Sequence, residues 1–177
     1  MAFQVRPFVK ADEQGVINLI VPIQQGEFGV PVTLEDQPDL LDIPSFYQTG
    51  RGGFWVAHAE GRVIGSIGLK AFGANGGGLR KMFVAAPWRG KQFGVAQALL
   101  ETLLAHANAT GTDEIVLGTV EILRAACRFY EKNGFMKVAP EDLPTGYPRM
   151  AVDSLFYRLK LGRRQVAAQR GPVTRGQ

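Results

Sequence analysis

The feature that most constrains the fold is a strand that runs through a basic, glycine-containing turn directly into an amphipathic helix. Apolar residues recur at helical spacing and share one face, namely Ala96, Leu99, Leu100, Leu103, Leu104 and Ala107. The first amides of a helix have no intrahelical partner and carry partial positive charge, so they can bind a pyrophosphate. Residues 82–96 therefore predict an anion site that suits a phosphorylated cofactor.

The remaining patterns place strands and helices on both sides of this segment. Strands are expected at residues 3–8, 54–59, 63–69, 79–84, 115–117, 135–138 and 153–161. Helices are expected at residues 12–25, with Asp12 as the N-cap, at residues 96–110, before Gly111, and at residues 121–133, before Gly134. The two strands around Glu60 and Gly61 should form an antiparallel hairpin, and Gly76–Gly78 should form the next turn. This order is typical of the mixed α/β class.

Residues 26–50 differ from the rest because Pro31, Pro38 and Pro44 interrupt any long period. Thr33 and Asp36 are candidate caps of one short helix there. We expect this stretch to be a mobile or substrate-facing wall.

Composition limits the function classes. The 177 residues are 46% hydrophobic and 20% charged, which fits one domain, expected at residues 1–162. Four of the 20 basic residues lie in residues 163–177 without any acid, and the other 16 match the 16 acids. We therefore expect a disordered basic tail rather than a nucleic-acid-binding arm.

The sequence predicts a soluble, cytoplasmic protein. Cys127 is the single cysteine, which excludes an internal disulfide, and neither a membrane span nor a signal peptide is apparent. His58 and His106 have no partner at metal-ligand spacing, so no metal is expected.

Two segments resemble the GCN5-related N-acetyltransferases. The family signature is Arg or Gln, two residues, Gly, one residue, then Gly or Ala, and residues 91–96 (KQFGVA) match it with Lys91 in the first place. Read from Arg89 instead, the signature has Gln92 where the first Gly belongs. The second segment, residues 125–135, is similar to the family helix that ends in an Ala, Tyr and Gly-Phe pattern, and the order of elements agrees from residue 3 to residue 161. The resemblance implies a predominantly antiparallel sheet flanked by helices.

The resemblance also implies acetyl-coenzyme A as co-substrate. The strand before the turn would splay from its neighbour and bind the pantetheine arm as an added strand does. The implied cofactor-binding residues are Met82, Phe83, Val84, Arg89, Gly90, Lys91, Gln92, Phe93, Gly94, Val95, Ala96, Ala126 and Tyr130.

By the same resemblance, Tyr130 is the general acid that protonates the departing thiolate. Spacing alone favours a core aromatic of an amphipathic helix, and the two motifs together favour the catalytic role. The strands at residues 63–69 and 79–84 contain no carboxylate for the general base. Glu27 and Glu121 are therefore tentative bases, acting directly or through water, and each is also a plausible surface acid.

The expected function is direct transfer of an acetyl group to a primary amine of a small molecule or peptide, without nucleic acid or membrane as partner. Family members often form homodimers. The alternative is a non-catalytic sensor of acyl-CoA, or a partner protein with the same fold, because Gln92 departs from the signature and the strand carboxylate is absent.

Overall fold

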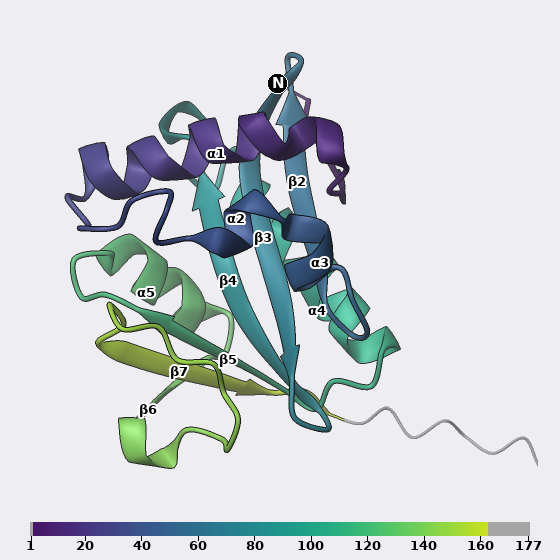
Figure 1. The fold of residues 1–177 in the computed structure, drawn as a ribbon, viewed down its shortest axis with the longest axis vertical. Helices are drawn as coiled ribbons and strands as arrows, with labels where there is room; N and C mark the ends of the chain where they lie inside the picture. The colour runs from purple at the N-terminus through teal and green to yellow at the C-terminus, as the bar shows by residue number, and fades with distance from the viewer. Residues whose placement is uncertain (1, 163–177) are drawn as a thin grey trace, which may run out of the picture.

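The computed structural model describes residues 2–162, which form one mixed sheet with helices on both faces (Figure 1). The strands are β1 (Gln4–Pro7), β2 (Gly53–Ala59), β3 (Arg62–Phe72), β4 (Gly76–Val84), β5 (Glu114–Thr119), β6 (Met136–Val138) and β7 (Leu155–Lys160). The helices are α1 (Glu13–Pro22), α2 (Pro38–Leu41), α3 (Ile43–Tyr47), α4 (Val95–Ala109) and α5 (Arg124–Lys132). Short helical turns are η1 (Lys10–Asp12), η2 (Ile23–Glu27), η3 (Ala86–Trp88) and η4 (Pro140–Asp142). The expected basic tail at residues 163–177 lies outside the described residues.

The sheet has the order β1-β2-β3-β4-β5-β7-β6, and β4 with β5 is its parallel pair. These two strands pair over a short stretch, Gly76–Gly78 with Glu114–Val116. Beyond it they separate, so the second half of β4 has no strand partner on the β5 side. The expected splay of this strand from its neighbour is therefore present.

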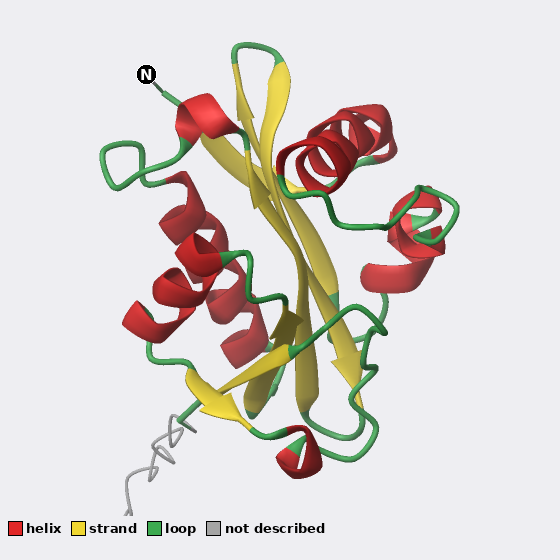
Figure 2. Ribbon diagram, turned by 90° about the vertical axis from the view of Figure 1, so that its left-hand side faces the viewer, coloured by secondary structure: helices red, strands yellow, loops and turns green. Residues whose placement is uncertain are grey.

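Helices lie on both faces of the sheet (Figure 2), and an apolar cluster of buried side chains lies on each face. Side chains alternate along β2, so that Trp55 and Ala57 pack with α4 and α5 while Phe54 and Val56 pack with α1, α2 and α3. Burial of both faces stabilises the sheet and holds the β4/β5 opening between the two layers. Within residues 2–162 no helix has both the length and the apolarity needed to cross a membrane.

A β-bulge bends β4 where the opening begins. The pairing with β3 shifts between Ser66 and Gly68, and Lys81 takes a left-handed backbone with φ of 52°. The buried Ser66 hydroxyl donates a hydrogen bond to the Lys81 carbonyl at 2.6 Å, which satisfies a group that the ladder has lost. Bulges re-aim side chains, and this one sets the directions of Lys81 and of the residues after it.

All seven predicted strands occur, but the glycine turn was predicted wrongly. Gly76–Gly78 belongs to β4 and pairs with both neighbouring strands. Glycine is required there by crowding, since a Cβ on Gly77 would lie 2.6 Å from Leu69 Cδ1 and one on Gly76 would overlap the Phe72 ring.

Three details of the helices also differ from prediction. Asp12 stands at the N-cap position of α1, but its carboxylate bonds to Arg6 at 2.7 and 2.9 Å and to the Val9 amide at 3.0 Å rather than to α1. Thr33 and Asp36 bond to each other, and α2 begins only at Pro38. Helix α5 begins at Arg124, because Glu121 lies in a turn that ends β5.

Candidate active site

Two cavities open where β4 and β5 separate. The larger has a volume of about 450 Å³ and lies between the end of β4, the turn before α4, and α5. The smaller, of about 120 Å³, lies between β4, β5 and the loop before β7. They share six lining residues, namely Phe28, Met82, Phe83, Leu123, Ala126 and Tyr130. The arrangement therefore offers two compartments that meet at one wall.

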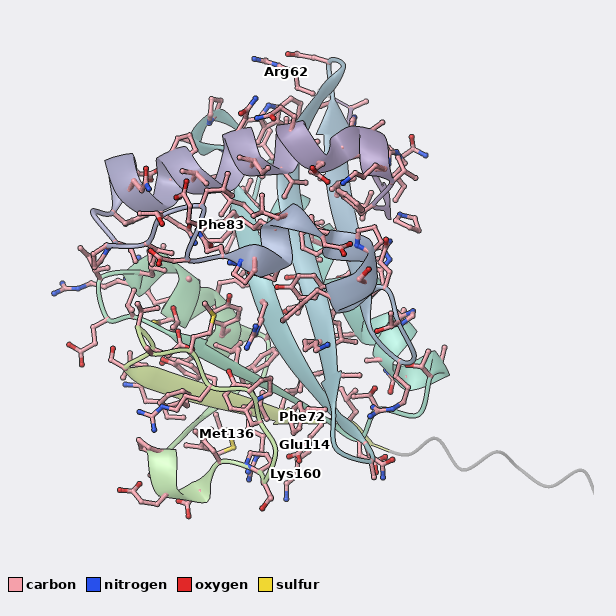
Figure 3. All side chains as sticks on the ribbon, viewed as in Figure 1. Arg62, Phe72, Phe83, Glu114, Met136 and Lys160 are labelled. Atoms are coloured by element: carbon pink, nitrogen blue, oxygen red, sulfur yellow. The ribbon has the colours of Figure 1, made fainter. Side chains whose placement is uncertain are left out.

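The strand β4 supplies part of that shared wall. Met82 packs toward the layer of α4 and α5, whereas Phe83 packs toward the layer of α1 to α3. Figure 3 labels Phe83 near the upper end of β4, below α1. The backbone of residues 82–84 has no strand partner on the β5 side, so it can pair with an extended ligand.

The turn into α4 presents backbone amides. Gly90 and Gly94 have backbone φ angles of 105° and 70°, which residues other than glycine rarely adopt. Gly94 is the N-cap of α4. Within the described residues, the amides of Gly90, Lys91 and Gln92 donate to no protein acceptor. Together with the first amides of α4, they form an anion-binding arrangement. The Gln92 side chain folds over Gly90, where a Cβ would lie 2.5 Å from its Oε1.

The predicted cofactor residues fall into two groups. Eight of them line the larger cavity, namely Met82, Phe83, Val84, Arg89, Gly90, Ala96, Ala126 and Tyr130. Lys91 and Gln92 are exposed on the turn, Phe93 packs against Trp88 at 5.7 Å between ring centroids, and Val95 is buried in the core. Their assigned contacts with the cofactor stay predictions.

Tyr130 lies at the junction of the two cavities. It is buried on α5 and packs against Phe135 and Tyr157. Burial, with a smaller contribution from Cys127, raises the pKa of its phenol above the ordinary value. The hydroxyl therefore keeps its proton at neutral pH and can act as a hydrogen-bond donor.

Neither predicted base lines these cavities. Glu27, in η2, forms an ion pair with Arg89, with Oε2 accepting from Nη2 at 2.8 Å. Hydrogen bonds from Arg89 outweigh burial and lower the pKa of the Glu27 carboxyl. Glu121 lines a separate depression beside Cys127 and Tyr157.

Asp153 is the carboxylate that sequence reasoning missed. It lines the smaller cavity from the loop before β7 and lies against Gly118 in β5, where a Cβ would overlap its carboxylate. Burial raises the pKa of Asp153 to about 6, despite the Met150 amide and the nearby cations Arg80, Arg149 and Lys81. A glycine inside a strand marks a close approach, so Gly118 was the available signal.

Comparison with known proteins places this geometry in context. The family described as "Acetyltransferase (GNAT) domain" matches residues 50–137. A GNAT-family acetyltransferase from Staphylococcus aureus Mu50 is 31% identical, with a TM-score of 0.87 over 91% of this chain and 100% of that one. An acetyltransferase from Thermoplasma acidophilum, solved in complex with coenzyme A, is 18% identical with a TM-score of 0.69 over 91% of this chain and 100% of that one, and shows a shared fold.

Among curated proteins, N-acetylaspartate synthetase from Danio rerio is 33% identical over 69% of this chain and 44% of its own length. The chain thus spans about half the length of the curated relatives that it matches. Three observations point to one family. They are the splayed β4/β5 pair, the turn into α4 and the similarity over the full length of the staphylococcal enzyme. The chain belongs to the GNAT family of acetyltransferases.

Proposed function

We propose that this protein transfers an acetyl group from acetyl-CoA directly to a primary amine of a small molecule or peptide. The observation that carries the proposal is the meeting of two cavities at Met82, Ala126 and Tyr130. The larger compartment suits a long, phosphorylated thioester, and the smaller suits its acceptor. The names of the related N-acetyltransferases support the same reading.

The protein groups around the larger cavity fit acetyl-CoA. The backbone of residues 82–84, which has no strand partner on the β5 side, can form hydrogen bonds with the amides of pantetheine. The free amides of the α4 turn can donate hydrogen bonds to a pyrophosphate. Ala126 leaves room because its side chain is small. Each charge-assisted hydrogen bond to phosphate contributes about 1.5 to 3 kcal/mol, so several give tight binding.

The proton transfers are assigned to two residues on opposite sides of the junction. Asp153 accepts the proton that the ammonium group of the acceptor must lose, and the neutral nitrogen then attacks the thioester carbon. The carbon–sulfur bond breaks, Tyr130 protonates the departing sulfur, and the new amide nitrogen releases its extra proton to water, from which Tyr130 regains a proton. A carboxyl group with a pKa of about 6 is ionised at neutral pH and still basic enough for this role. Glu27 and Glu121 remain possible only through water, since neither lines the cavities.

Thiol release tests the proposal. Acetyl-CoA is incubated with amino acids, polyamines, aminoglycosides and peptides, and the initial rate of free thiol formation is followed with each. At least one amine should raise the rate well above that of acetyl-CoA alone. Failure of all these classes, with acetyl-CoA binding intact by calorimetry, favours the second candidate, a non-catalytic acyl-CoA sensor.

The sensor is retained as a candidate because Gln92 stands where one register of the family signature has glycine, and its side chain covers Gly90. It predicts acetyl-CoA binding without turnover. Replacement of Gln92 by Gly separates the two candidates further. In an enzyme the substitution should change the KM for acetyl-CoA, whereas a sensor should show no transfer activity before or after it.

A further inference from the structure

The smaller cavity contains charges that the proposed transfer does not fully explain. Its charged lining residues are Arg80, Lys81 and Asp153, and its remaining lining side chains are neutral. Lys81 has an internal counter-charge, because its Nζ lies 3.5 Å from the carboxylate of Asp39 and donates to Gln37. Lys81 is therefore balanced by the protein itself, which leaves Arg80 and Asp153.

Arg80 is a half-buried cation without an anionic partner. Its Nη2 donates to the carbonyl of Pro148, and its guanidinium carbon lies 5.7 Å from the centre of the Phe46 ring. Its Nε is buried without a hydrogen-bond partner, and within residues 2–162 no carboxylate forms a salt bridge with it. Its hydrogen-bond partners are thus neutral, the Pro148 carbonyl and the Tyr47 hydroxyl, and a ligand carboxylate would give this partly desolvated cation a counter-charge.

Asp153 is the complementary case on the same cavity. Its carboxylate is half-buried against Gly118 and forms no salt bridge among the described residues. Arg80 is close enough to act on Asp153 electrostatically, yet the two do not pair. Apart from Lys81, which has its own counter-charge, the smaller cavity is thus lined by one cation and one anion that form no salt bridge with each other.

We propose that the acceptor is a primary amine that also carries a carboxylate, as an amino acid does. Arg80 binds the carboxylate through its guanidinium group, and Asp153 binds the ammonium group and accepts its proton. This inference rests on the proposed acetyl transfer and names its substrate class. An α-ammonium group, with a pKa of about 8, also gives up its proton more readily than a lysine-like group with a pKa of about 10.4.

The rest of the lining describes the side chain that this acceptor can carry. Phe28, Val30, Val32 and Met150 are apolar, and the volume of about 120 Å³ limits the ligand to a small molecule. A small amino acid fits these walls, whereas a polyamine would place a second cation near Arg80.

The test compares amines that differ in a single carboxylate. L-leucine is paired with 3-methylbutylamine, L-methionine with 3-(methylthio)propylamine, and L-alanine with ethylamine, and kcat/KM is measured for each at saturating acetyl-CoA. In the best pair the α-carboxylate should raise kcat/KM by about 10- to 100-fold, the gain expected from charge-assisted hydrogen bonds. Equal rates within every pair would overturn the inference.

Variants of Arg80 locate the effect. Arg80→Gln should abolish the preference through a higher KM for the amino acid, with the KM for acetyl-CoA unchanged, and Arg80→Lys should keep part of it. Arg62→Gln is the matched control, since Arg62 is exposed, pairs with Glu60 and lines neither cavity. Thermal unfolding checks each fold, and an Arg80→Gln protein that keeps the full preference contradicts the assignment.

The outcomes also separate this inference from the proposed function. If the decarboxylated amines or polyamines are acetylated as well as the amino acids, acetyl transfer stands and carboxylate recognition fails. If no amine of any class is acetylated by a protein that binds acetyl-CoA, both fail.

Discussion

At the scale of single residues, the site depends on a phenol and a carboxyl group whose pKa values are both raised by burial. Tyr130 stays protonated and faces the junction of the cavities, while the pKa of Asp153, about 6, allows it to be ionised at neutral pH. One group can donate a proton and the other can accept one, in a site where each protonation state suits its task.

Tyr130→Phe should lower kcat by about 100-fold or more, because it removes the proton donor and keeps the ring that packs on α5. Affinity for acetyl-CoA by calorimetry should be unchanged. Tyr157→Phe is the matched control, since the Tyr157 hydroxyl bonds to Glu131 at 2.9 Å and lies outside both cavities. Equal kcat values for wild type and Tyr130→Phe would remove Tyr130 from the mechanism.

Asp153 predicts the pH dependence. In the wild type, kcat/KM for the amine should rise with pH through about 6, as the carboxyl group ionises. Asp153→Asn should lose this limb and most of the activity. Because the folded pKa is raised, ionisation of Asp153 destabilises the folded state, so the stability of the wild type relative to that of Asp153→Asn should fall from about pH 4 to pH 6. A variant that keeps the same pH profile as wild type contradicts the role of Asp153 as base.

At the scale of elements, the site is built by strands that stop pairing. β4 and β5 pair through Gly76–Gly78 and then diverge, and the bulge at Lys81 turns the rest of β4 toward the opening. The loop before β7 then places Asp153 across Gly118 of β5. Three elements that are distant in the sequence thus meet at one cavity.

Gly118→Ala tests this placement. The added methyl group overlaps the Asp153 carboxylate and must displace it, so kcat/KM should fall by about 10- to 100-fold with acetyl-CoA affinity retained. Gly26→Ala is the control, because a Cβ there meets no atom within 4 Å. Full activity in Gly118→Ala would mean that the position of Asp153 does not matter.

At the scale of the whole molecule, polar contacts connect the helical layer of α1 to α3 to the sheet near the cavities. The buried Asp39 of α2 accepts from the Tyr47 hydroxyl at 2.5 Å and faces Lys81 of β4. Burial lowers the pKa of Lys81, against the opposing effect of Asp39. This polar cluster connects two layers that otherwise meet through apolar contacts.

Asp39→Ala should destabilise the fold by about 3 to 5 kcal/mol, because it leaves the buried Lys81 ammonium without a counter-charge. Urea unfolding measures the loss. Glu60→Ala, which breaks the exposed pair with Arg62, should change stability little. A loss for Asp39→Ala no larger than that of Glu60→Ala would show that Lys81 does not need its partner.

The sequence predicted the strands, the α4 turn and the position of Tyr130, since these follow from local periodicity and from a motif within one segment. It did not predict Asp153, the proposed base, because Asp153 reaches the cavity through the loop before β7 and the prediction considered the central strands. Gly76–Gly78 read as a turn because glycine is typical of turns, whereas packing against Phe72 and Leu69 is a tertiary effect. The Arg89–Glu27 pair likewise joins residues far apart in the chain.

The most direct test of two joined compartments is the binding of a bisubstrate ligand. The best acceptor amine is linked covalently to coenzyme A through an acetyl bridge, and its dissociation constant is measured by calorimetry beside those of coenzyme A and the acetylated amine. The linked ligand should bind about 100-fold more tightly than coenzyme A, since one molecule fills both cavities. Binding no tighter than that of coenzyme A alone would contradict a shared site.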